Sequence, residues 1–280
     1  MNRRDNGKKA NGMTFCERIR KNAQSFMRAN GFAFKKGIFY RIENDMAFCM
    51  NLEMPTGTVY SNCFVLPLYV PTEFCYMTYG TRLTVGAAER DGDAENAAEL
   101  ADKLMSILSN DIFPCFQTIS SPDAFFTQVS HRALFAPHEC RISDVFVQRL
   151  RLATAFYEKR YSEIPEICGE YMKVLADAPY LTSGCKKIYF DEVRLFQNAM
   201  ALSDPEKETL MAEIIRKNRT GVLWPVTAME IRWLPVQKRL CQPAVDRFQA
   251  VNWWLATRKN GTLTPTSRRS ISATKRRKRI

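Results

Sequence analysis

Histidine is scarce in this chain, and its two copies are the first residues to suggest chemistry. They are His131 and His138, and the run His138-Glu139-Cys140 places three metal-ligating residue types side by side. A structural zinc site uses four ligands, normally in recognisable pairs, and no Cys-x-x-Cys pair is present. The simpler interpretation is a polar loop between two folded parts, with Pro137 favouring a turn. We therefore expect no metal ligands and no cofactor.

Catalytic signatures are also missing from the sequence. Covalent catalysis needs a nucleophile beside an oriented base, and acid–base catalysis needs two groups held in different environments. The chain contains no Gly-x-Ser-x-Gly, no glycine-rich phosphate loop and no His-Glu-x-x-His. We expect no catalytic residues and a non-catalytic protein, and an enzyme of unrecognised type is the third functional class left open.

The C-terminal tail carries the most distinctive chemistry. Residues 258–280 contain nine Lys or Arg and no Asp or Glu. Such cationic runs bind nucleic acid, acidic proteins or anionic membranes, or serve as nuclear addresses; the plain alternative is a solvated, disordered end. The candidate polyanion-binding residues are Arg258, Lys259, Arg268, Arg269, Lys275, Arg276, Arg277, Lys278 and Arg279.

The net positive charge of the protein comes from the two ends of the chain. The whole protein carries a net charge of +12, of which residues 258–280 supply nine charges and residues 1–12 supply three. Residues 13–257 are therefore neutral overall. Any binding of nucleic acid is expected to be non-specific and to belong to the tail, because phosphate contacts alone carry no sequence information.

The cysteines and the hydropathy pattern indicate a compartment. The chain has nine cysteines, an odd number, and several lie within apolar patterns. Cysteines of this kind are typical of buried free thiols in a reducing cytosol, so we expect a cytoplasmic protein without a disulfide framework. A membrane-spanning helix needs a run of about 18 apolar residues, and the sequence contains none.

The N-terminal half predicts a helix followed by an antiparallel meander. Thr14-Phe15-Cys16-Glu17 fits a capping box, which begins a helix over about 14–30. Residues 34–42 and 46–53 then read as strands from their period of two, followed by 59–70 and a weaker strand at 75–85. Short turns between consecutive strands imply antiparallel pairing.

Helices are expected from there to the tail. Asp93 begins a helix that stops before Pro114, and Ser121-Pro122-Asp123 begins a shorter one. Beyond Ser143 no convincing strand pattern appears. Helix patterns centre on 146–157, 164–175 and 188–202, Ser203-Asp204-Pro205-Glu206 is a strong start signal, and a last helix runs from about 236 or 243 to 256.

One segment of the N-terminal half resembles a known family. Residues 26–41 read Phe-Met-Arg-Ala-Asn-Gly-Phe-Ala-Phe-Lys-Lys-Gly-Ile-Phe-Tyr-Arg, and the later runs Ile112-Phe113-Pro114 and Ile119-Ser120-Ser121-Pro122-Asp123 follow. These motifs resemble the bacterial domain-of-unknown-function family numbered 4304 over about residues 13–130. The resemblance implies a small α+β domain of bacterial or phage type, and it implies no catalytic residue.

These patterns together predict an α+β protein. An α-β-β-β(β)-α domain, with an antiparallel meander packed by helices, is expected over 13–135, and an all-helical domain over 143–257. A disordered basic arm, 1–12, precedes them and a disordered basic tail, 258–280, follows. We expect a protein-binding or regulatory module with an unidentified protein partner. The alternative is an accessory protein that the tail anchors non-specifically to nucleic acid.

Overall fold

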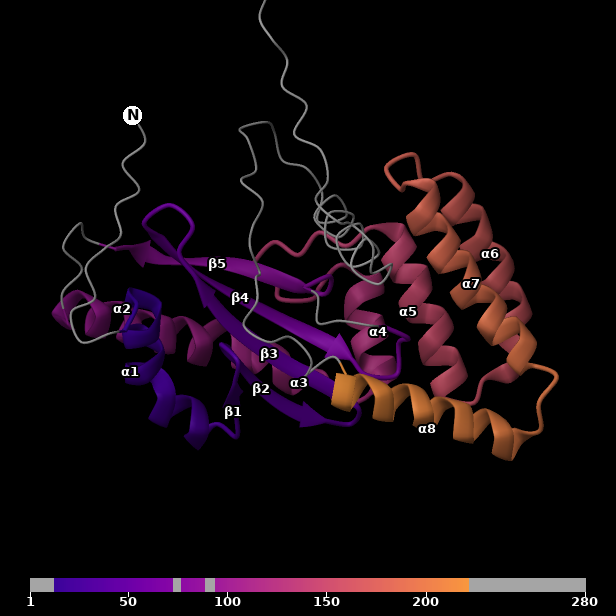
Figure 1. Cartoon of the computed structure of the whole chain (residues 1–280), viewed down its shortest axis with the longest axis horizontal. Coiled ribbons are helices and arrows are strands. Elements are labelled where there is room, and N and C mark those ends of the chain that lie inside the picture. The colour runs from indigo at the N-terminus through magenta and orange to yellow at the C-terminus, as the bar shows by residue number, and fades with distance from the viewer. Residues whose placement is uncertain (1–12, 73–76, 89–93, 222–280) are drawn as a thin grey trace, which may run out of the picture. The chain divides into compact units, whose positions relative to one another are not determined.

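The described part of the chain, residues 13–72, 77–88 and 94–221, forms an α+β fold in a computed structural model. An N-terminal helix precedes a five-stranded sheet, and helices make up the rest (Figure 1). The elements in chain order are α1 (Phe15–Ala29), β1 (Ala33–Lys35), β2 (Ile38–Glu43), β3 (Met46–Glu53), β4 (Thr58–Pro67), β5 (Gly80–Ala87), α2 (Ala94–Ile107), the π turn η1 (Leu108–Ile112), α3 (Phe113–Thr118), α4 (Pro122–Ser130), α5 (Asp144–Tyr157), the 3-10 turn η2 (Tyr161–Glu163), α6 (Ile164–Ala176), α7 (Ser183–Ala199) and α8 (Asp204–Gly221).

The sheet is the antiparallel meander that the sequence predicts. Its strand order is β1-β2-β3-β4-β5, and each neighbouring pair is antiparallel. The prediction of a single strand over 34–42 is wrong, because the chain turns back at Lys36 and Gly37. Their φ angles are 50° and 87°, and glycine adopts such positive values without steric cost. The strand predicted over 59–70 ends earlier, at Pro67.

Local sequence signals fix several helix starts. The Thr14 hydroxyl accepts a hydrogen bond from the Glu17 amide at 3.3 Å, which completes the predicted capping box of α1. The Ser121 hydroxyl accepts one from the Ala124 amide at 3.1 Å at the start of α4. The predicted start of α8 at Ser203 is also confirmed, because the Glu206 carboxylate accepts a hydrogen bond from the Ser203 amide at 2.8 Å.

Two helix boundaries differ from the sequence prediction. The helix expected to stop before Pro114 instead ends at Ile107, continues as the π turn η1 and runs into α3. Pro114 lies in the first turn of α3, where its missing amide proton is not needed. α7 begins at Ser183, five residues before the predicted Ile188, because the Thr182 hydroxyl caps it by accepting from the Cys185 amide. The helix predicted over 236–256 lies outside the described residues.

Helices α1, α2 and α3 cover one face of the sheet (Figure 1). Aromatic side chains make this contact: the ring of Phe48 on β3 lies 4.9 Å from that of Phe116 on α3, and Phe32 lies 5.4 Å from Phe113. Offset and tilted ring pairs at such distances stabilise a core beyond the apolar area they bury. These contacts fix α3 against the sheet, and α2 packs against β5, where a Cβ at Gly86 would lie 2.6 Å from the Leu100 side chain.

Buried polar contacts join the end of the sheet to the helices that follow. Tyr79 donates a hydrogen bond to the Phe146 carbonyl at 3.0 Å, from the residue just before β5 to α5. Asn218 on α8 donates to the carbonyls of Leu68 and Val70, at 2.6 and 2.8 Å. All described residues fall within one compact unit, Met1–Cys241, and the second unit lies outside them. The predicted domain boundary near 135–143 stays a prediction.

A buried ion pair also lies where the end of the sheet meets the helices that follow it. Arg149 on α5 lies 2.8 Å from the Glu192 carboxylate on α7, and both side chains are almost completely buried. Arg149 also donates to the Pro71 carbonyl. Burial raises the pKa of Glu192 and the guanidinium of Arg149 opposes that rise. Removing either partner would leave an uncompensated buried charge, so the pair favours one arrangement of these helices.

Two further sequence predictions concern free thiols and membrane-spanning helices. Seven cysteines lie in the described residues, and all seven are free, as expected. Burial raises the pKa of Cys63 to about 12. None of the helices in residues 13–72, 77–88 and 94–221 is long and apolar enough to cross a membrane.

Candidate functional site: a groove along the edge strand β5

The strand β5 lies at one edge of the sheet. It pairs with β4, and within the described residues no further strand lies on its other side. An edge strand directs every second backbone N–H and C=O away from the sheet, which makes it a template for another strand. The position of β5 is therefore a property to explain, because proteins normally shorten or cover such edges.

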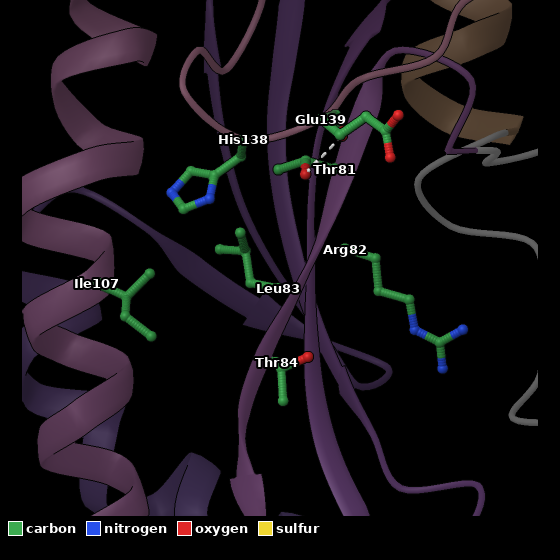
Figure 2. Close-up of a pocket in the computed structure, with 7 residues that line it drawn as sticks. All are labelled: Thr81, Arg82, Leu83, Thr84, Ile107, His138 and Glu139. Carbon is green, nitrogen blue, oxygen red and sulfur yellow. Dashed lines mark hydrogen bonds between the residues drawn. The ribbon is translucent and has the colours of Figure 1, made fainter.

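A groove of about 410 Å³ follows this edge. Its walls come from β5 itself, from Ile107 at the end of α2, and from the segment before α5. The lining residues are Thr81, Arg82, Leu83, Thr84, Ile107, His138 and Glu139. Figure 2 shows Leu83, Ile107 and His138 on one side of β5, whereas the side chain of Arg82 points to the other. The groove thus straddles the strand and is not a cavity within one face.

The segment 138–140 closes one end of the groove. The Thr81 hydroxyl donates a hydrogen bond to the Glu139 carbonyl at 3.0 Å, which fixes this segment against the first residues of β5 (Figure 2). Burial raises the pKa of Cys140 to about 12, and a hydrogen bond from the Gly80 backbone opposes that rise. The Cys140 thiol is therefore protonated at neutral pH and acts as packing beside the strand.

An acidic partner orients the histidine of the groove. His138 Nε2 lies 3.0 Å from Asp111 Oδ2, and both side chains are partly exposed. Asp111 belongs to the π turn η1, and such turns occur frequently at functional sites. The carboxylate fixes the orientation of the His138 ring, which also lines the groove. Cys115 lies one turn after Asp111, but burial raises its pKa, with the Asp111 charge adding to the effect. This is the opposite of thiol activation.

Arg82 occupies the other side of β5. Its guanidinium lies 4.1 Å from the centre of the Tyr60 ring, and Nη2 lies 2.6 Å from Glu53 Oε1. Tyr60 and Glu53 come from β4 and β3, so the arginine lies across the sheet and does not project into solvent. These contacts hold the Arg82 side chain in one orientation over the sheet, on the face opposite Leu83.

The residues singled out from the sequence fall largely elsewhere. All nine candidate polyanion-binding residues of the tail lie outside the described residues, as do the basic arm 1–12 and Cys75. His131 caps the end of α4 through its backbone and is exposed, whereas His138 lines the groove. Within the described residues, no group of three or more His, Cys, Asp or Glu side chains is placed to hold a metal ion.

Sequence reasoning missed most of the groove. Thr81, Leu83 and Thr84 were recognisable only as members of a strand, and Ile107 only as an apolar position of a helix. The alternation over 81–85 was the available signal, and it indicates a strand without saying whether a neighbour pairs on both sides. His138 was noticed, but for a metal site and not for its contact with Asp111.

Comparison with known proteins adds no relative: no family model, no curated protein and no solved structure matches this chain. The resemblance of residues 13–130 to the family numbered 4304 therefore stays a prediction.

Proposed function

We propose that this chain is a protein-binding module that takes an extended segment of a partner protein as an additional strand beside β5. The observation that carries this proposal is the groove, because it follows an edge strand and is lined from both of its sides. In strand addition, backbone hydrogen bonds supply affinity and alternate side-chain contacts supply specificity. A pocket within one face would instead suit a compact small molecule.

The lining residues define the partner's pattern. Paired strands lie about 4.8 Å apart and direct successive side chains to opposite faces. One side chain of the added strand therefore faces Leu83 and Ile107, and the next faces Thr84 and Arg82. The first environment combines the aliphatic side chains of Leu83 and Ile107 with the His138 ring, and the second is polar, so the partner segment alternates aliphatic and polar residues over about four to six positions.

The chemistry of the groove supports binding over catalysis. The thiols of Cys115 and Cys140 have raised pKa values, so neither of them is activated as a nucleophile. An activated nucleophile needs a lowered pKa or an adjacent base. Binding of nucleic acid by the tail is a separate proposal, supported by the nine cations of residues 258–280 and tested independently below.

A peptide selection tests the strand-addition proposal. A displayed library of 12-residue peptides is selected against the full-length protein at about 0.3 M salt, where long-range attraction to the basic tail is screened. Enriched peptides are expected to alternate aliphatic and polar residues. Hydrogen exchange should then show added protection in residues 80–87 when the best synthetic peptide is bound, because new backbone hydrogen bonds form there.

The matched variant is Ile107→Glu, which places a carboxylate in the apolar side of the groove. Ile107 is only partly buried, so the fold should survive, and thermal unfolding checks this. The best peptide is expected to bind the variant at least about tenfold more weakly, because an unpaired charge would be desolvated. Equal binding to both proteins, or protection confined to residues outside β5, would overturn the proposal. A selected peptide that displaces a self-associated form would identify a second copy as the natural occupant.

A further inference from the structure

The face of the sheet opposite α1, α2 and α3 has an apolar end. Phe48 on β3 contacts α3, so its neighbours Ala47 and Cys49 point to the opposite face. The strand register pairs them with Leu66 and Phe64 on β4, whose side chains share that face. All four residues are at most 4% exposed, so this end of the face belongs to a core and is not a solvent-exposed surface.

The other end of the same face is polar, and its side chains contact one another. Asn62 Nδ2 donates a hydrogen bond to Asn51 Oδ1 at 2.9 Å, and Arg82 is ion-paired with Glu53. An apolar segment laid over these groups would remove them from water at a cost in free energy. A segment that covers this face is therefore expected at the apolar end, where Cys49 lies.

Helix α8 ends beside the apolar end of this face. Asn218, in the last turn of α8, donates a hydrogen bond to the Leu68 carbonyl just beyond β4, and Arg219 is ion-paired with Asp45 in the turn before β3. The Leu68 amide also bonds the Asp45 carbonyl at 2.8 Å, so both anchors adjoin the same end of the β3–β4 pair. The chain therefore leaves α8 next to the apolar end.

The residues that follow α8 are largely apolar. Residues 222–236 lie outside the described residues, and their sequence, Val-Leu-Trp-Pro-Val-Thr-Ala-Met-Glu-Ile-Arg-Trp-Leu-Pro-Val, contains only two charges, of opposite sign. Trp224 comes five positions after Arg219, which is up to about 17 Å of extended chain. Cys49 comes four strand positions after Asp45, about 13 Å away. Trp224 is therefore within reach of the middle of the apolar end.

We propose that residues 222–236 pack over the apolar end of this face, with Trp224 on Cys49 and Phe64. The occupant is a segment of the same chain because it begins at this face and has the matching apolar composition. An indole buries a large apolar area, and small side chains beside larger ones allow packed layers to interdigitate. None of the residues of the apolar end lines the β5 groove, so the proposal does not depend on strand addition there.

Photo-crosslinking in the full-length protein tests the proposal. A benzophenone-bearing amino acid replaces Trp224, and mass spectrometry locates the crosslink after irradiation. The crosslink is expected within one copy of the chain, at residues 47–49 or 64–66. Crosslinks only to a second copy would overturn the proposal by assigning the face to a partner chain. Crosslinks only to elements away from this face would overturn it as well.

Thiol labelling supplies a second measurement with a matched control. Cys49 lies on this face and Cys63 on the opposite face, and both are fully buried. Trp224→Asp should speed alkylation of Cys49 about tenfold or more, because the covering segment is displaced, and leave the rate at Cys63 unchanged. Trp254→Asp makes the same change outside the segment and should leave both rates at their wild-type values.

Three labelling results would overturn the proposal. The first is an equal Cys49 rate in the wild type and in Trp224→Asp. The second is equal acceleration of Cys49 and Cys63, because the segment would then support the whole fold and not this face. The third is acceleration at Cys49 by Trp254→Asp instead, because a later part of the chain would then be the occupant.

Discussion

The sheet has two edge strands among the described residues, and they differ in every respect that matters for strand pairing. β1 has three residues, all exposed, and it turns directly into β2 at Lys36 and Gly37. β5 has eight residues, and a groove follows it. Natural proteins protect sheet edges with short strands and with lysine, and β1 carries both devices.

A free edge is therefore not a binding site by itself. β1 offers only three residues of backbone, so an added strand would gain few hydrogen bonds there. β5 combines eight residues of backbone with side chains on both of its faces that line a groove. Affinity from the backbone and selectivity from side chains can therefore act together only at β5.

The largest expected effect is the loss of DNA binding when the basic tail is removed, with peptide binding at the β5 edge unchanged. Full-length protein and residues 1–257 are titrated on unrelated DNA duplexes at several salt concentrations. If six to nine contacts form, the slope of log affinity against log salt is roughly −5 to −8, which lowers affinity about 10³- to 10⁵-fold between 50 and 200 mM salt. The truncated protein should not bind DNA, yet it should bind the β5 peptide unchanged. Equal DNA binding by the truncated protein would place the site in the neutral body.

Proline at each edge tests the comparison directly. Thr84→Pro in β5 removes a backbone donor and stiffens the strand, so the selected peptide should bind about 100-fold more weakly. Ala33→Pro, at the first position of β1, should leave peptide affinity within about twofold. Isothermal titration measures both, and thermal unfolding confirms the fold. Similar losses in the two variants would mean that proline acts through the whole sheet and not through its β5 edge.

Two glycine substitutions compare how much free energy of unfolding is lost when a Cβ is added at each edge. A Cβ at Gly80 would lie 2.5 Å from the Phe64 Cβ and 2.7 Å from the Cys63 carbonyl oxygen, so Gly80→Ala should destabilise the protein by about 2 kcal/mol. Gly37→Ala at the β1 hairpin should cost about 1 kcal/mol, because there the positive φ is the main penalty. Urea unfolding gives both free energies, and a larger loss at Gly37 would reverse this ranking of the two edges.

Cleavage of the segment that closes the groove should have the smallest effect. Limited proteolysis is expected to cut near 132–142, the predicted boundary. The two pieces should still elute together, because Tyr79, Arg149 and Asn218 make buried contacts between them. Peptide affinity should fall by less than about tenfold, since one hydrogen bond from Thr81 fixes the segment and a single bond contributes about 1 kcal/mol. Separation of the pieces would support two independent domains.

Part of the fold was predictable because the signals are local. The caps at Thr14, Ser121 and Ser203 each satisfy backbone amides within a few residues, so the sequence places those helix starts correctly. The two wrong boundaries, in the strand predicted over 34–42 and at Pro114, also have local causes, which hydropathy patterns do not reveal. Lys36 and Gly37 adopt positive φ inside an apparently continuous strand, and Pro114 fits a first helical turn as readily as it ends one.

The groove was not predictable, because its parts come from separated segments. Thr81 meets Glu139 across 58 positions, and Asp111 meets His138 across 27. Nothing in the types of these residues marks them as neighbours. Their proximity follows from how α2, η1 and the segment before α5 pack around the edge of the sheet.

Periodicity, caps and composition act over short distances, so the α+β class, the antiparallel order of the strands and the net positive charge of the two ends were all predictable from the residues alone. Tertiary packing made β5 an edge strand, brought side chains from β5, α2 and the segment 138–140 around one groove, and left Ile188 and Leu195 exposed on α7. The physical reason is that an alternating or heptad pattern states which side chains share a face. Whether another part of the protein covers that face depends on packing between residues far apart in the chain.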